Sequence, residues 1–527
     1  MSKPFDVIVI GSGFGGAVTA CRLSEKGMKV LVIERGRRWD PKDYPREPGD
    51  AWIFDPDAPQ KQNGWLDFRM YDDMAIAVGA AVGGGSLIYA NVSVEAKKEL
   101  FNQGWPPEIT YDVLKPYYDK VGVMLNLQTI PEGQATERYK LMREAAQKAG
   151  YESRFMPLPL AVTFDKEYSY QSKDPFNDKH SKKWINAQGV EQGTCVHCGN
   201  CDIGCQVRAK NTLDLNYLPW AEKHGAEIWP LHVVNFIQPE NGGYRVHFDR
   251  LERGQRVSGS ESAKRVILSA GSLGSTEILL RSREQYKTLP NLSDFLGLNW
   301  SSNGDFLTPA FYSDREVSPT QGPTISSAID FLDGSVDGQK FFIEDGGFPD
   351  LLGNYLEEKL KIGTRNQKYV SLLTALGGMV RKRNPLGNVM PWFAQGIDAA
   401  DGRLYLGRPW YAPWQQKKLK LDWDIDRSKA VMDAIINMHK RLAKVTGGNP
   451  WVPPTWTVLK NLVTPHPLGG CNMGKTKESG VVNHRGEVFG YPNLYVADGA
   501  IIPEAVGLNP SKTIAALAER IADLIKA

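Results

Sequence analysis

The sequence predicts an α/β fold, because three stretches far apart in the chain each read as a strand, a tight turn and a helix. They begin near residues 5, 265 and 491. A chain of 527 residues is long enough for two or three domains, each with its own core. We therefore expect one discontinuous domain whose sheet is assembled from separated segments, and a second domain built from the segments in between.

The first stretch carries the pattern of a dinucleotide-binding turn. Residues 5–10, FDVIVI, form a continuous apolar run, as a parallel strand covered on both faces requires. G-x-G-x-x-G follows between this strand and a helix, where backbone can approach a pyrophosphate, and Glu34 ends the next strand, where a carboxylate can bind a ribose. Such a unit at the start of a chain favours FAD over NAD. The predicted FAD contacts here are Gly11, Ser12, Gly13, Phe14, Gly15, Gly16, Glu34 and Arg35.

A second glycine-rich stretch, residues 77–96, contains three successive glycines. Backbone without side chains can pass within contact distance of a ligand, although a flexible surface loop would have the same composition. The strand, turn and helix at 265–282 extend the dinucleotide sheet. Further predicted cofactor contacts are Gly79, Gly83, Gly84, Gly85, Ser86, Asn91 and Ala270 from these regions, and Val234 from a nucleotide-domain strand at 227–236.

The C-terminal stretch predicts a helix that points at the cofactor. Residues 494–496 read as a short strand, Asn509 as a helix N-cap and Pro510 as the first helical residue. The partial positive charge of this helix N-terminus suits the negative charge that develops on a reduced flavin. The predicted cofactor contacts here are Asp498, Gly499, Asn509, Pro510 and Ser511.

Five ordered motifs together resemble the glucose–methanol–choline (GMC) oxidoreductases: GSGFGG, GAAVGGGSLIYANVSVE, VILSAGSLGSTEILLRS, LGLNWSSNGD and HPLGGCNMG with NLYVADGAIIPEAVGLNPSKT. Within that family, the chain is most similar to the bacterial cholesterol oxidases and steroid alcohol dehydrogenases. The resemblance implies a Rossmann-like FAD-binding domain and a substrate domain with an antiparallel β-sheet and helices. We assign residues 1–110, 191–310 and 455–527 to the FAD domain, and residues 111–190 and 311–454 to the substrate domain.

The resemblance also implies the reaction, oxidation of an alcohol by loss of its hydroxyl proton and hydride transfer to flavin N5. His466 is the expected catalytic residue beside the hydroxyl, and imidazole is chemically suited to accept that proton. Asn509 is the expected second catalytic group, although a helix cap would explain it equally well. Non-covalent FAD is expected, since residues 77–96 contain no histidine that could link it.

One departure from the family pattern concerns a glutamate that related cholesterol oxidases place near the steroid. The stretch where it is expected, residues 383–398, contains only one acid, Asp398. Glu344 is a substitute candidate. Without a carboxylate in this role, His466 is the base and isomerisation of a Δ5 to a Δ4 ketosteroid is in doubt.

Four cysteines, Cys195, Cys198, Cys201 and Cys205, have the spacing of a bacterial ferredoxin cluster run. Three interpretations stay open: an iron–sulfur cluster, a zinc site that includes His197, or a metal-free loop. A cluster would pass electrons to an external acceptor, whereas its absence would leave molecular oxygen as the natural acceptor.

Composition limits the partners and the compartment. A formal net charge of +3 without long charged runs predicts no nucleic-acid binding. Sparse cysteines and an N-terminus without a signal-peptide pattern predict a cytoplasmic protein, and no apolar run reaches the ~20 residues of a membrane span. Peripheral membrane contact stays open, with residues 350–363 as an amphipathic candidate. The aromatic-rich segment 311–454 fits a steroid or another bulky alcohol and does not distinguish between them. The resemblance to cholesterol oxidases implies a 3-hydroxysteroid, with another bulky or long-chain alcohol as the alternative. A flavin-bearing binding or electron-carrier module without catalysis is the third hypothesis.

Overall fold

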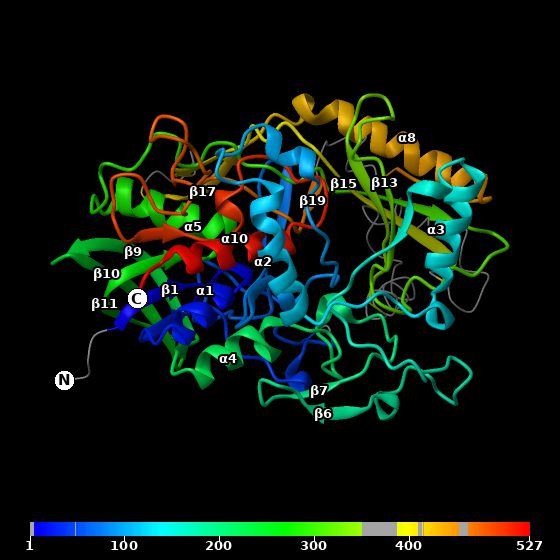
Figure 1. Ribbon diagram of the computed structural model, residues 1–527, viewed down its shortest axis with the longest axis horizontal. Helices are drawn as coiled ribbons and strands as arrows, with labels where there is room; N and C mark the ends of the chain where they lie inside the picture. The colour runs from blue at the N-terminus through cyan, green and yellow to red at the C-terminus, as the bar shows by residue number, and fades with distance from the viewer. Residues whose placement is uncertain (1–4, 48, 350–386, 409–413, 415, 453–461) are drawn as a thin grey trace.

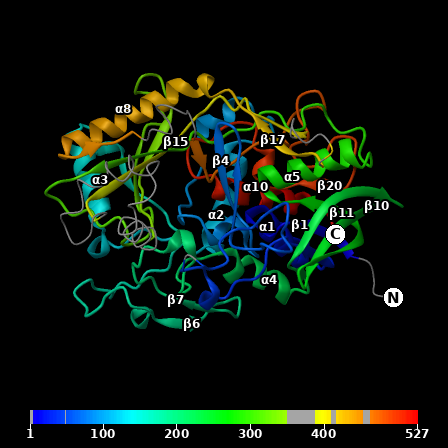
Figure 2. The same ribbon diagram turned by 180° about the vertical axis from the view of Figure 1, so that it is seen from behind.

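The computed structural model describes residues 5–47, 49–349, 387–408, 414, 416–452 and 462–527. Two large sheets organise this part of the chain, and they lie toward opposite ends of the molecule in both views (Figure 1 and Figure 2). The first and last described segments of the chain meet in one of these halves. The mixed α/β architecture that the sequence predicts is therefore confirmed.

The larger sheet contains seven strands among the described residues and is parallel on one side. Its order is β8-β2-β1-β11-β10-β9, with β20 paired to β11. The long strand β11 is parallel to β1 over its last residues and antiparallel to β10 over its first part. The bounds are β1 Phe5–Ile10, β2 Val30–Ile33, β8 Glu227–Trp229, β9 His232–Glu240, β10 Gly243–Glu252, β11 Gln255–Leu268 and β20 Leu494–Val496.

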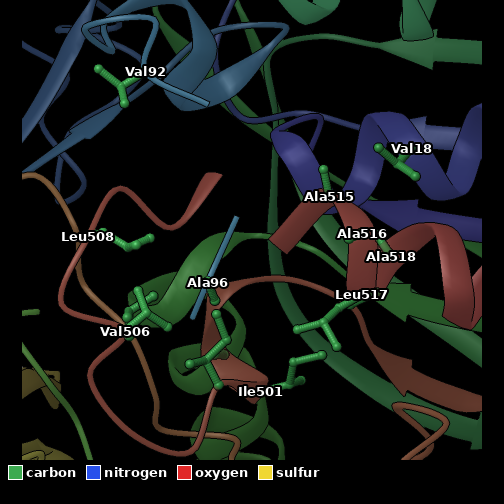
Figure 3. Packing of buried hydrophobic residues seen from close by; sticks show 14 of the residues in the cluster. Val18, Val92, Ala96, Ile501, Val506, Leu508, Ala515, Ala516, Leu517 and Ala518 are labelled. Atoms are coloured by element: carbon green, nitrogen blue, oxygen red, sulfur yellow. The ribbon is translucent and has the colours of Figure 1, made fainter. Parts of the chain in front are cut away.

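The helix at the C-terminus fixes the position of the cofactor end of this sheet. Helix α10 (Ser511–Leu524) packs between α1 (Phe14–Glu25) and α2 (Tyr111–Met124). Figure 3 shows Ala515, Ala516 and Ala518 of α10 beside Val18 of α1. These small side chains let the two helices approach closely, and the β1–α1 turn and the N-terminus of α10 line the same cavity.

The second large sheet is antiparallel, with the order β18-β12-β15-β14-β13-β5. The bounds are β5 Phe155–Pro157, β12 Phe306–Phe311, β13 Ser327–Asp330, β14 Phe341–Asp345, β15 Val389–Gly396 and β18 Asn449–Pro450. Helices α3 (Glu137–Lys148) and α8 (Lys429–Val445) pack against this sheet and against each other, which places both on the same face. Because successive side chains of a strand point to opposite faces, every second side chain of this sheet points to the face away from the helices, where a cavity lies.

Smaller elements connect these two halves. Strands β3 (Leu66–Met70), β4 (Met74–Gly79) and β19 (Leu462–Thr464) form one small sheet. The two remaining pairs are β6 (Lys183–Ile185) with β7 (Glu191–Gly193), and β16 (Arg403–Gly407) with β17 (Lys418–Asp422). The other α-helices among the described residues are α4 (Tyr217–Lys223) and α5 (Gly271–Leu280). Among the described residues, no helix is both long enough and apolar enough to cross a membrane.

Two local predictions are confirmed and one is wrong. The strands predicted at 5–10 and 494–496 are β1 and β20. Asn509 is not the cap of the last helix, because α10 begins at Ser511 and Pro510 occupies the N-cap position without a side-chain hydrogen bond. The amphipathic helix predicted at 350–363 lies outside the described residues.

Candidate active site

One cavity of about 1000 Å³ is lined by residues from both halves of the molecule. The β1–α1 turn, the glycine-rich segment after β4 and the N-termini of α5 and α10 contribute one part of its wall. Leu307, Pro391 and Phe393 of the antiparallel sheet contribute another. Most of the wall is apolar, as expected of a site for a small organic ligand.

The glycine-rich segment 83–85 packs directly onto the dinucleotide turn, which excludes the flexible-loop interpretation. Gly84 has a φ of +53°, and a Cβ at this position would lie 2.7 Å from the Gly13 Cα atom. A Cβ on Gly13 or Gly85, by contrast, would meet no protein atom within 4 Å. The two segments therefore need glycine for contact with each other, and they leave open space above Gly13 and Gly85.

Ser12 joins the three segments that surround this open space. Its Oγ donates to Glu34 Oε2 at 2.7 Å and accepts from the Gly83 backbone N at 3.0 Å. The other carboxylate oxygen of Glu34 accepts from Gly36 N at 2.9 Å, and burial is the main cause that raises the pKa of Glu34. Each carboxylate oxygen has two lone pairs, so Glu34 Oε1 retains capacity for a ribose hydroxyl.

The open glycine turn and Glu34 fit an FAD molecule, because they offer backbone to a pyrophosphate and a carboxylate to a ribose. A buried amide lies just behind this part of the wall. Asn91 has a φ of +69°, and neither its Nδ2 nor its Oδ1 has a hydrogen-bond partner among the described residues. Its neighbours Ala90 and Val92 line the cavity, whereas Asn91 itself does not.

A histidine–aspartate pair stands at the cavity wall. His466 Nδ1 lies 2.9 Å from Asp305 Oδ1, and Thr464 Oγ1 donates to Asp305 Oδ2 at 2.6 Å. The Thr464 hydroxyl also accepts from the His466 backbone N at 2.9 Å. Burial alone would lower the pKa of His466, but the charge and hydrogen bond of Asp305 outweigh it and raise the pKa above the ordinary 6.5. Because Asp305 occupies Nδ1, the Nε2 atom is left for a ligand.

Asn509 and Glu344 meet beside this pair. Asn509 lines the cavity, its Nδ2 lies 3.5 Å from Glu344 Oε2, and its Oδ1 has no hydrogen-bond partner among the described residues. Gln395 Nε2 donates to the same Glu344 oxygen at 2.8 Å. Burial raises the pKa of Glu344 to about 7, although Gln395 and His466 oppose the rise. Glu344 itself is fully buried and does not belong to the cavity wall.

The strand register places the substitute candidate Glu344 beside the stretch where the glutamate is expected. Glu344 of β14 is paired with Phe393 of β15. Asp398 has a different role. Its carboxylate accepts from Ser301 Oγ at 2.7 Å and from the Ser302 backbone N at 2.9 Å, which anchors the segment that leads to Asp305. Residues 383–386 of this stretch lie outside the described residues.

Hydrogen bonds to its backbone hold the cysteine loop in place. All four thiols are free, and no group of three His, Cys, Asp or Glu side chains in the described part of the chain is arranged to hold a metal. His197, considered as a zinc ligand, lies 2.9 Å by Nε2 from Gln134 Oε1 and 3.0 Å by Nδ1 from the Tyr170 hydroxyl. Lys210 Nζ donates to Cys201 O at 2.6 Å and to Leu87 O at 2.8 Å. The structure therefore gives no support to an iron–sulfur cluster.

Most of the predicted catalytic and cofactor-binding residues line the cavity described above, and four of them do not, nor do the four cysteines. Those that line it are Gly11, Ser12, Gly13, Phe14, Gly15, Glu34, Arg35, Gly79, Gly84, Gly85, Val234, Ala270, His466, Asp498, Gly499, Asn509, Pro510 and Ser511. Gly16, Gly83, Ser86 and Asn91 lie behind the wall. A Cβ at Gly16 would lie 2.0 Å from Gly11 O, and Ser86 Oγ donates to Gly83 O at 2.7 Å, so both shape the turns.

Sequence reasoning missed Asp305, Thr464 and Gln395. Asp305 ends the motif LGLNWSSNGD. The polar residues at the end of this motif, just before a strand, were the signal that could have indicated Asp305 as a site residue. Asn303 of the same motif accepts from the backbone N atoms of Val506 and Gly507, each at 2.9 Å, and so holds the loop that delivers Asn509. Gln395 gave no local signal, because its role follows from sheet pairing.

Comparison with known proteins agrees with this geometry. Residues 398–518 match the family model described as GMC oxidoreductase, and residues 9–39 match that of an NAD(P)-binding Rossmann-like domain. A cholesterol oxidase of Acinetobacter baumannii is 32% identical to this chain, and the alignment covers 99% of this chain and 94% of the relative. The chain belongs to the GMC oxidoreductase family. It is accordingly an FAD-dependent alcohol oxidoreductase.

Further relatives and a solved structure extend the comparison. A cholesterol oxidase of Mycobacterium tuberculosis is 31% identical over 99% of this chain and 91% of its own. A long-chain-alcohol oxidase of Arabidopsis thaliana is 24% identical over 99% of this chain and 67% of its own. Among solved structures, pyridoxine 4-oxidase from "Mesorbium loti" has a TM-score of 0.62 at 16% identity, with 98% of each chain covered, which supports the shared fold.

Proposed function

We propose that this GMC oxidoreductase oxidises the secondary hydroxyl of a 3-hydroxysteroid to a ketone. The observation that carries the proposal is the His466–Asp305 pair at the wall of a mostly apolar cavity of about 1000 Å³. The dinucleotide turn lines the same cavity. Such a cavity suits a bulky hydrophobic alcohol. The two cholesterol oxidases among its relatives support the choice of a steroid.

His466 is the proposed proton acceptor. With Nδ1–H donated to Asp305, the neutral imidazole has its lone pair on Nε2, which accepts the proton of the substrate hydroxyl. The Asp305 carboxylate then stabilises the imidazolium that forms. FAD, held without a covalent bond by the turn and the N-terminus of α10, supplies the acceptor for the hydride that leaves the carbinol carbon.

Asn509 and Glu344 have distinct proposed roles. Asn509 reaches the cavity and orients the substrate oxygen through its amide. Glu344 acts through Asn509, because it lies behind the wall and faces the Asn509 Nδ2 atom at 3.5 Å. The charges of Asp305 and Glu344 both act on His466. The position of the double bond in the product will report whether Glu344 moves a proton between carbons.

Molecular oxygen is the proposed electron acceptor, as the names of the related oxidases suggest. The alternative is a cluster at the cysteine loop that passes electrons to an external acceptor. Iron analysis of protein purified without oxygen separates the two: clean flavin bands without iron support oxygen, whereas a brown shoulder with stoichiometric iron would establish the cluster.

The test of the substrate is anaerobic mixing with a 3β-hydroxysteroid while the visible flavin spectrum is recorded. We expect bleaching of the flavin and formation of the 3-ketone. A second candidate, a long-chain primary alcohol, is favoured by the Arabidopsis relatives. Bleaching by long-chain alcohols but by no steroid would refute the proposal in favour of that candidate. Failure of every alcohol would favour a non-catalytic flavin module.

A further inference from the structure

An acidic side chain with no role in the site described above stands in the apolar cavity wall. Asp202 belongs to the short helix η7 (Cys201–Ile203) of the cysteine loop, and both Asp202 and Ile203 line the cavity. The Thr324 side chain faces the Asp202 carboxyl. Thr324 is 4% exposed, and its Oγ1 makes no hydrogen bond of normal geometry with any described residue.

Two cations lie near this pair, but each is bound to backbone carbonyls. Lys210 Nζ donates to Leu87 O, Tyr89 O and Cys201 O. The Arg138 guanidinium, fully buried, donates to the carbonyls of Gln321, Pro323, Thr324, Asp345 and Gly346. Both cations therefore act on Asp202 through charge at longer range and do not saturate its oxygens.

The hydrogen-bond partners of Arg138 show that the antiparallel half of the molecule forms this part of the cavity wall. Two residues whose carbonyls it holds, Thr324 and Gly346, line the cavity and belong to the connections before β13 and after β14. These connections are part of the antiparallel half of the molecule. Ile325 and Phe348 on the same connections make the surrounding wall apolar. The pair thus offers hydrogen-bonding groups to a ligand whose surface is otherwise hydrocarbon.

We propose that Asp202 and Thr324 bind a second hydroxyl group of the substrate, remote from the hydroxyl that is oxidised, an inference that rests on the proposed function. The substrate is then a hydrophobic diol. A neutral donor is favoured over an ammonium group, because Lys210 and Arg138 already supply positive charge beside Asp202. The second hydroxyl donates to the carboxylate and can accept from the Thr324 hydroxyl, which otherwise lacks a partner among the described residues.

The test compares a parent 3β-hydroxysteroid with a series that carries one further hydroxyl at successive ring and side-chain positions. For the wild-type holoenzyme we expect kcat/KM for at least one diol to exceed that for the parent by about 10- to 100-fold, the usual range for a buried hydrogen bond to a charged group. Asp202→Leu should abolish this preference and leave the parent's kcat/KM nearly unchanged. Thr324→Val should reduce the preference by a smaller factor.

Controls separate the outcomes. Asp178→Leu, at an exposed aspartate, should keep the preference, and FAD content with thermal melting checks that each variant folds. Equal kcat/KM for the parent and every diol would overturn the Asp202 proposal while the proposed function stands. Weaker FAD binding in Asp202→Leu with unchanged discrimination would overturn it too, because Asp202 would then serve the cofactor. If no steroid bleaches the flavin, the proposed function itself fails.

Discussion

Substitution of Glu344 by Gln tests the electrostatics of the site through stability. Burial raises the pKa of Glu344 from an ordinary 4.5 to about 7. Between these values the unfolded chain loses the proton while the folded protein keeps it, so wild-type stability falls as pH rises from about 4.5 to 7 and then levels off. The Glu344→Gln side chain keeps a carbonyl that can accept from Gln395 and Asn509 but never ionises, so the variant escapes this loss.

The size of the effect follows from the same values. Each pKa unit corresponds to about 1.4 kcal/mol, so ionised Glu344 costs the folded state up to about 3 kcal/mol above pH 7. We expect thermal melts of the holoenzyme to show little difference between variant and wild type near pH 4.5, and a variant more stable by a few degrees in Tm at pH 8.

The pH dependence of the difference is the decisive readout. Glu132→Gln, an exposed control, should give a melting curve parallel to wild type at every pH. Two results would refute the reasoning: a Tm difference between Glu344→Gln and wild type that stays constant across the pH range, or a Tm of wild type that rises relative to that of the variant as pH rises. The hydrogen bonds of Glu344 would then dominate over its desolvation.

The remaining predictions concern the reaction and the cofactor. His466→Ala should retain FAD but lose flavin reduction by alcohol by about 10²- to 10⁴-fold, and unchanged reduction would refute its role as base. Asp305→Asn should shift the acidic limb of the kcat/KM profile to lower pH, because the carboxylate raises the pKa of His466; an unshifted limb would contradict this. Gly13→Ala should fold normally but bind FAD weakly, since its Cβ enters open cavity space, and the exposed control Gly133→Ala should bind FAD like wild type.

The parts of the fold that the sequence predicts are those determined by local patterns. The run at 5–10, the glycines after it and the short strand at 494–496 have the structures expected of them, because chain neighbours alone decide a buried strand or a tight turn. The hydrogen-bond partner of His466 could not be predicted from local patterns. Asp305 lies 161 positions earlier in the chain, and only the packing of β12 beside β19 brings the two together.

Asn509 shows how a correct residue can carry an incorrect structural interpretation. An asparagine before Pro-Ser and an amphipathic run is the usual signal of an N-cap. The competing influence is Asn303, which holds the backbone of Val506 and Gly507 and turns the Asn509 side chain toward Glu344. Helix propensity therefore yields to a tertiary hydrogen-bond network, and the position becomes available for chemistry.

The cysteine run has a structural role that needs no cluster. Cys195 Sγ accepts from the His197 backbone N at 3.4 Å and Cys205 Sγ from the Ala209 N at 3.2 Å, so these sulfurs organise a tight loop. Burial raises the pKa of Cys198 to about 12, which keeps that thiol protonated. Lys210 then joins the loop to the glycine-rich segment beside the cofactor. The loop so held carries Asp202 into the cavity wall, where, on the proposal above, it contributes to the choice of substrate.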